Sequence, residues 1–418
     1  MKLNLILCAL IFAPSAALSA QHAAAIPTPL ATLLKEAEAN NADVAVADDN
    51  WKAQMHVAQQ ASARPGPEIS VQSFDVGSPK PFAGFSNSEF AYLGLGASQQ
   101  LPYKDKLKLR GEVANREMET QKAAAGVVRS SVAEQVKLLY LQISYSTGAI
   151  KYIDRTDSVL QSLIQEALAR YSIGQGSQAA ILRAQLERTQ IQRQDTMHYQ
   201  NLDRAQARIK QLLHRAQDSL DIVPVPLAAT PFNHDIAELQ TQLRNQNPRL
   251  QVDSSAIRKQ DAQLASAKRE IKPDFSVGGQ VELTGEGYRN RYEMTATIQL
   301  PNRSRVSGEV AQAAQQATRA RHVLDAEVQQ TLAELQEQAA VVRRTTELLD
   351  EFTQGLLPQA EAVFHSEESS YKENKEDLAP VLSSLVDVLQ LENDYQQTIF
   401  DHEAALARME TLTGETLR

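Results

Sequence analysis

Histidine, cysteine, aspartate and glutamate are the residues that most often carry metal or acid–base chemistry, and in this chain of 418 residues they are scattered. No two of the eight histidines lie four residues apart, the spacing that places two zinc ligands on one face of a helix. Neighbouring carboxylates such as Glu367 and Glu368 are typical of solvated helix faces. We therefore predict no enzymatic activity, no metal site and no cofactor.

The charge balance and the first residues indicate which partners and which compartment to expect. A formal net charge of -9 argues against a nucleic-acid partner, because phosphate binding needs a concentrated basic surface. Residues 1–20 place Lys2 before an apolar run that ends in small residues, which predicts a cleavable export signal. Cys8 lies inside that run, so we do not expect an acylated N-terminus. The chain is thus predicted to be exported.

Two halves of the chain repeat the same order of patterns. Residues 30–63 and 236–267 each carry apolar residues at helical spacing, predict one helix each, and superpose at an offset of about 206. The phrase Arg-Gly-Glu-Val-Ala at 110–114 returns as Ser-Gly-Glu-Val-Ala at 307–311. We expect a first repeat over 21–215, a linker over 216–234 and a second repeat over 235–418.

Each repeat contains two runs in which apolar and polar residues alternate, the pattern of strands with one apolar face. The expected strands span about 67–76 and 90–101 in the first half and about 273–284 and 291–300 in the second. No apolar run of about twenty residues follows the export signal, so a membrane role would have to rest on these strands. Four strands are too few to close a membrane barrel, and several copies of the chain would have to associate.

A very long helix follows each strand pair, and a shorter helix returns after a turn. The long helices are expected over about 104–169 and 303–371, with a kink in the second at Gly355 and Pro358. At about 1.5 Å per residue the first would be a rod of roughly 100 Å, longer than a compact core requires. The returning helices are expected over about 178–215 and 378–412.

The turns between these helices have a sequence of their own. Gly174 and Gly176 permit positive φ, and Ser177 can cap the next helix. The second turn has no glycine, so Asn374 must take the left-handed conformation there. Tyr171 and Tyr371 occupy equivalent positions.

This order of elements resembles the TolC-like outer-membrane factors of bacterial efflux and export systems. The landmarks are Tyr-Ser-Ile-Gly-Gln-Gly-Ser at 171–177 and Lys-Leu-Arg-Gly-Glu-Val-Ala at 108–114, which are most similar to the heavy-metal RND efflux branch. The resemblance implies a mainly α-helical homotrimer with a twelve-stranded β-barrel in outer-membrane lipid and a helical tunnel in the periplasm. It also implies two protein partners, a periplasmic adaptor and an inner-membrane RND pump.

The resemblance places the function of the helical tips in two sets of residues. The turn residues would dock the adaptor; they are Tyr171, Gly174, Gly176, Ser177, Tyr371 and Asn374. The positions that often carry the family's acidic gate hold Pro380 and Ser383 here, so other acids would have to form a ring around a threefold axis. The candidates are Glu373, Glu376, Asp377 and Asp387, for which solvated acids favoured by the helix dipole are the alternative.

The predicted function is passive conduction of solutes, including heavy-metal cations, through an outer-membrane channel. Two alternatives stay open: the outer-membrane channel of a type I secretion system, and a periplasmic helical-hairpin adaptor or structural coiled coil. An adaptor would share the export signal and the long helices but should lack two matched strand pairs. The sequence does not identify the exported solute or the pump.

Overall fold

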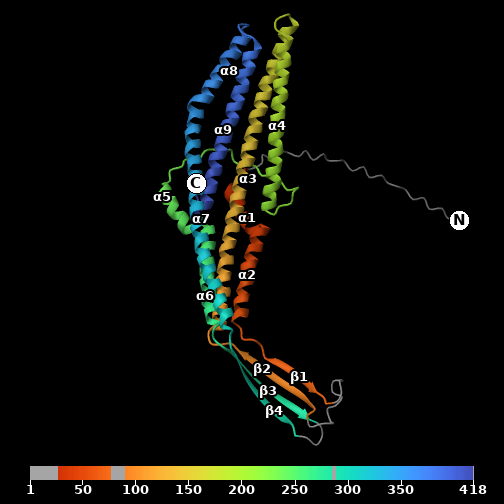
Figure 1. The fold of residues 1–418 in the computed structure, drawn as a ribbon. Helices are drawn as coiled ribbons and strands as arrows, with labels where there is room; N and C mark the ends of the chain where they lie inside the picture. Colours follow the sequence, from red (N-terminus) through yellow and green to blue (C-terminus); the bar gives the residue numbers. More distant parts are fainter. Residues whose placement is uncertain (1–26, 77–89, 285–288, 418) are drawn as a thin grey trace, which may run out of the picture.

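The computed structural model describes residues 27–76, 90–284 and 289–417. The predicted export signal, residues 1–20 with Cys8, lies outside this part of the chain. The fold is elongated, with two long helical hairpins at one end and a four-stranded sheet at the other (Figure 1). In Figure 1 the helices α2, α3, α6 and α7 converge where they meet the strands.

The two halves of the chain have the same order of elements. The first half contains α1 (Leu30–Asn40), α2 (Ala42–Ser62), β1 (Glu68–Phe74), β2 (Tyr92–Leu101), α3 (Lys106–Ser172) and α4 (Gln178–Leu212). The second half contains α5 (Ile236–Gln246), α6 (Pro248–Arg269), β3 (Asp274–Thr284), β4 (Arg291–Gln299), α7 (Arg303–Glu351), a π-helical turn η1 (Phe352–Leu356), α8 (Leu357–Lys372) and α9 (Leu378–Thr413). The strands lie within two residues of the ranges expected from alternation.

The prediction of one short helix at the start of each half is wrong, because each is broken into two by an asparagine. Asn41 and Asn247 both leave the helical conformation, with ψ of 129° and 124°. The side chain of Asn247 accepts hydrogen bonds from the N–H groups of Arg249 (2.9 Å) and Leu250 (3.1 Å), and its Nδ2 donates to the carbonyl of Leu412 (2.8 Å). Asn41 makes the same three contacts in the first half, with the carbonyl of Leu212 as acceptor. Helical periodicity continues across the break, so apolar spacing alone did not reveal it.

We expect Asn247→Ala to destabilise the fold by about 2 kcal/mol. The change removes a helix cap, worth about 1 kcal/mol, and one hydrogen bond to a carbonyl at a position that is 1% exposed. The control is Asn302→Ala: Asn302 caps α7 from an exposed position and makes no cross-link, so about 1 kcal/mol should be lost. Chemical denaturation followed by circular dichroism measures both. Equal losses would show that the link to Leu412 contributes nothing.

The predicted kink in the second long helix is confirmed as a π-helical turn at Phe352–Leu356. Pro358 lies in the first turn of α8, where the absence of an N–H leaves no hydrogen bond unmade. α3, the equivalent helix of the first half, runs without such a turn from Lys106 to Ser172. The two hairpins therefore differ in the path of one arm, which Figure 1 shows as a change of direction between α7 and α8.

The core consists of three buried clusters spread along the helices. One holds the two hairpins together near their tips, with Leu160 on α3 and Leu382 on α9 almost fully buried. The other two occupy equivalent positions in the two halves, around Leu33 and around Leu239. Among the residues described, no helix is both long and apolar enough to cross a membrane.

The four strands form one antiparallel sheet in the order β1-β2-β3-β4. Leu95 in β2 lies opposite Val71 in β1 and Val281 in β3, which fixes the register of the three strands. Within the described residues, the outer edges of β1 and β4 pair with no further strand. The sheet thus presents two open edges.

Candidate functional site

The sheet separates its side chains into one apolar and one polar face. Because directly paired residues point to the same side, the register assigns the residues of one face without ambiguity. We call this the apolar sheet face; it carries Ile69, Val71, Leu93, Leu95, Phe275, Val277, Val281, Tyr292, Met294 and Ile298. Nothing in the described chain covers it: Ile69 is 82% exposed and Met294 is 93% exposed. Contiguous apolar surface of this kind marks a membrane or partner contact.

The opposite face of the sheet is polar and charged. Gln72, Gln280 and Glu293 lie on it, and Gln280 donates to Glu282 Oε1 at 2.9 Å. Arg291 lies 3.6 Å from the same carboxylate. A sheet with these two faces can separate lipid from water, the arrangement that membrane strands adopt.

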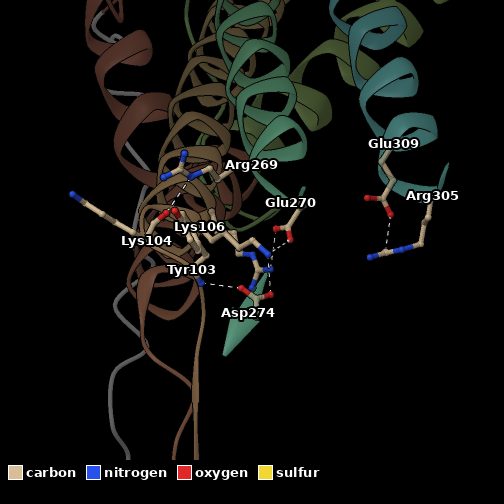
Figure 2. A network of polar contacts seen from close by, with 9 residues as sticks. Tyr103, Lys104, Lys106, Arg269, Glu270, Asp274, Arg305 and Glu309 are labelled. Carbon is tan, nitrogen blue, oxygen red and sulfur yellow. Dashed lines mark hydrogen bonds and ion pairs between the residues drawn. The ribbon is translucent and has the colours of Figure 1, made fainter. Parts of the chain in front are cut away.

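A polar network joins the sheet to the helices (Figure 2). The carboxylate of Asp274, the first residue of β3, accepts hydrogen bonds from the N–H of Tyr103 and from Lys106 Nζ, both at 2.8 Å. Lys106 is 2% exposed and also pairs with Glu270 at 3.1 Å. Arg269 donates to the carbonyl of Lys104 and lies over the ring of Tyr103. These contacts link the ends of α3, α6 and β3 and so fix the sheet on the helices.

At the far end of the helices, the two turns have the conformation that the sequence predicts. Gly174 and Gly176 have φ of 79° and 113°, and Asn374 has φ of 59°. The hydroxyl of Ser177 accepts a hydrogen bond from the N–H of Ala180 (3.2 Å). In both turns an N–H returns to a carbonyl five residues back, from Gln175 and from Lys375, which closes each helix end.

The two equivalent tyrosines of the tips have different environments. Tyr171 is 47% exposed, whereas Tyr371 is 5% exposed and lies beneath the guanidinium of Arg170, 4.0 Å from the ring centre. Burial raises the pKa of Tyr371, so its phenol stays neutral at physiological pH. Of the predicted turn residues, Gly176, Ser177, Tyr371 and Asn374 line one pocket of about 360 Å³ between the hairpins.

Arg170 is the tip residue that the sequence did not single out. Its Nη1 donates to the carbonyl of Tyr371 (2.7 Å) and to Asn374 Oδ1 (2.6 Å), and its Nη2 donates to Glu166 Oε1 (2.5 Å). We call these contacts the Arg170 bridge; they connect α3 to the turn after α8. The equivalent residue in the second half is Ser370, so the bridge exists once per chain. The difference between Arg170 and Ser370, in two tips that otherwise match, is the feature of the sequence that could have identified Arg170.

The predicted acids lie at two levels. Glu373, Glu376 and Asp377 are exposed in the turn, where Glu373 pairs with Lys375 at 2.5 Å. Asp377 precedes α9 without a side-chain capping hydrogen bond, and Asp387 is exposed ten residues further along, about 15 Å away along the helix. A ring formed by these four acids and their copies stays a prediction. Across the described segments, no three His, Cys, Asp or Glu side chains are placed to hold a metal ion.

Halfway along the first hairpin, Asp195 on α4 carries an unfavourable charge. Burial raises its pKa, and Asp154 and Asp157 raise it further, while His198 acts in the opposite direction. Arg188 neutralises Asp157 through two hydrogen bonds of 2.8 and 2.9 Å but makes none to Asp195. Asp195 therefore favours the protonated form in the folded state more than in the unfolded state.

We expect Asp195→Asn to stabilise the fold at pH 7 by about 0.5 kcal/mol, after allowance for solvent screening. Because the pKa of Asp195 is higher in the folded state than its usual value of 3.8, the carboxyl lowers the stability of the fold as pH rises above 3.8. The gain should therefore shrink as pH falls toward 3.8 and disappear at about pH 3, where both side chains are largely neutral. Thermal unfolding at about pH 3 and at pH 7 measures this, with Asp203→Asn on the exposed face of α4 as the control. A gain independent of pH would contradict the assignment.

Comparison with known proteins gives one family and one fold. Residues 33–214 match the family described as outer membrane efflux protein. A search of curated proteins by sequence found no match. The family match covers most of the first half of the chain, including α1 to α4.

Solved structures extend the likeness to nearly the whole chain. The outer-membrane channel OprN superposes with a TM-score of 0.79 at 15% identity, over 93% of this chain and 90% of its own. The CmeC outer membrane channel of Campylobacter jejuni gives 0.77 at 12% identity, over 98% and 94%. CusC gives 0.76 at 14% identity, over 93% of both chains. The predicted likeness to the TolC-like outer-membrane factors is confirmed.

Proposed function

We propose that this chain is the outer-membrane channel of a tripartite efflux system. Residues 33–214 match the outer membrane efflux protein family, and the fold is similar to that of solved outer-membrane channels over 93% of the chain, which supports the proposal. The observation that carries the proposal is the four-stranded sheet with an apolar face, a polar face and two open edges. Open edges are not tolerated in lipid, so β1 of one copy must pair with β4 of the next.

Three copies would close a barrel of twelve strands, with the apolar sheet face toward lipid and the polar face toward water. The same threefold arrangement would place three pairs of hairpins side by side as a tunnel in the periplasm. The tunnel does no bond chemistry and takes up no energy. Its contribution is a sealed path from an inner-membrane RND pump, through a periplasmic adaptor, to the outside.

The charges at the tip support a preference for cations. Glu376 and Asp377 line the tip pocket with Arg183 and with Arg170, which is paired with Glu166, so three copies would bring six such carboxylates against three unpaired arginines to the entrance. A constriction lined by one sign of charge raises the local concentration of counter-ions. Heavy-metal cations are the proposed solutes, in line with the resemblance of residues 108–114 and 171–177 to the heavy-metal branch.

Single-channel recording in planar bilayers tests the proposal. Purified protein should insert as a trimer and give channels whose reversal potential in a KCl gradient has the sign of cation selectivity. Glu376→Gln with Asp377→Asn should reduce that selectivity without removing the channels. A protein that stays monomeric in water and never conducts would refute the proposal. The genes beside this one would identify the pump, and a type I secretion transporter there would redirect the assignment.

A further inference from the structure

Six basic side chains surround the place where the sheet meets the helices. We call them the basic collar. Its members lie at the ends of α2, α3, α6 and α7 nearest the sheet: Arg64, Lys104, Lys108, Lys268, Lys272 and Arg303. All six are exposed, and none makes an ion pair within the described parts of the chain. In Figure 2 the side chain of Lys104 points away from the polar network.

Four of the acidic residues near the basic collar are already paired with other cations, whereas Glu68, the first residue of β1, makes no ion pair within the described residues. Asp274 and Glu270 bind Lys106, at 2.8 and 3.1 Å. Asp105 pairs with Arg269 at 3.1 Å, and Glu309 pairs with Arg305 at 2.8 Å. With six cations against the single free carboxylate of Glu68, the collar is therefore a zone of excess positive charge in a chain whose net charge is -9. Such a zone calls for an anionic partner, because unpaired like charges repel one another.

The position of the collar identifies the partner. The apolar sheet face continues to exposed Leu101, Phe275 and Leu300, which are 37%, 39% and 77% exposed. Lys104 follows Leu101 by three residues, a distance of at most about 10 Å along the chain. A phospholipid is complementary to this arrangement, because its hydrocarbon chains can contact the apolar sheet face while its phosphate lies beside the basic collar. A pocket of about 440 Å³ lies at this junction, and Lys272 is the collar residue in its lining; the lining carboxylates of Glu270, Asp274 and Glu309 are paired with Lys106 and Arg305.

We infer that the basic collar binds the phosphate groups of anionic phospholipids in the membrane leaflet that faces the helices. The inference rests on the proposed function, since it takes the sheet to span a membrane. The collar then sets the depth of the sheet in the membrane: hydrocarbon covers the apolar sheet face, and phosphate contacts hold the junction at the lipid surface.

Lipid retention in detergent tests the collar separately from channel activity. Full-length protein is incubated with equal amounts of phosphatidylglycerol and phosphatidylethanolamine, passed over a sizing column, and its bound lipid is counted by mass spectrometry. The wild type should retain phosphatidylglycerol selectively. The triple variant Lys104→Gln, Lys108→Gln, Lys272→Gln should lose at least about fivefold of that selectivity, the contribution of one basic residue at an anionic surface.

The matched control removes three exposed, unpaired cations far from the sheet: Lys35→Gln, Lys151→Gln, Arg208→Gln. It should retain lipid like the wild type, whereas equal loss in both triple variants, or loss in neither, would overturn the inference. Displacement of the lipid by 20 mM inorganic phosphate, but not by NaCl of equal ionic strength, would also overturn it by showing a site for free phosphate. Bilayer conductance of the same samples reports on the proposed function alone, and the collar variant should still conduct.

Discussion

Leu95→Arg should abolish assembly of the protein in the outer membrane. Leu95 lies in the middle of the apolar sheet face, 50% exposed, opposite Val71 and Val281. Arginine on a lipid-facing strand near the bilayer midplane costs about 2 to 4 kcal/mol in each chain, and a trimer would bear it three times. Outer-membrane fractions of this variant should therefore lack the heat-modifiable oligomer that we expect the wild type to form. Val277→Arg on β3, 48% exposed on the same face, should have the same effect.

The matched control is Gln72→Arg, which adds the same side chain to the polar face. Gln72 adjoins Val71 in β1 and lies opposite Gly94, which has no side chain to obstruct a longer residue. This variant should assemble as the wild type does. If Leu95→Arg assembles equally well, the apolar face does not meet lipid and the proposed orientation is wrong.

Arg170→Ala should open the tips of the helices. The substitution removes charge-assisted hydrogen bonds to the Tyr371 carbonyl and to Asn374, together with the contact of the guanidinium with the Tyr371 ring. The Arg170 side chain is only 16% exposed, so we expect the joined tips to lose about 2 kcal/mol of stability relative to separated tips. That loss corresponds to a roughly thirtyfold larger population of separated tips. Single-channel recordings should show a matching increase in the time spent at high conductance.

Two further variants separate the geometry of the Arg170 bridge from its charge. Arg170→Lys keeps the charge but cannot donate to several acceptors in a fixed plane, so it should open the tips nearly as much as alanine. Arg183 is an exposed arginine in the same pocket and makes no ion pair within the described chain. Recordings of Arg183→Ala should therefore match those of the wild type. Equal conductance of Arg170→Ala and the wild type would show that the bridge does not hold the tips together.

Most of the architecture could be predicted from the sequence because two copies of one pattern reinforce each other. Alternation located the strands within two residues, and the turn residues Gly174 and Asn374 adopt the expected left-handed conformation. The Asn41 and Asn247 breaks were missed because apolar spacing is continuous across them. Their function depends on carbonyls at Leu212 and Leu412, more than 160 residues away in the chain, and no local pattern encodes such a contact.

The candidate sites were predicted less completely than the fold. The turn residues and the acids were found from their types, but Arg170 and the basic collar were not. Arg170 matters through the carbonyl of Tyr371, 201 residues away. The collar gathers residues from four separate segments, and it became visible only when the pairing of Asp274, Glu270 and Asp105 was known.

The repeated asparagine clamp also bears on how the molecule can change over evolution. Each half anchors its own short helices to its own returning helix, through Asn41 to Leu212 and through Asn247 to Leu412. A substitution in the short helices of one half should therefore leave those of the other half in place, because the two clamps share no residue. The tips behave differently: Arg170 reaches from the first half to the carbonyl of Tyr371 in the second, so a change there alters the contacts of both hairpins at once.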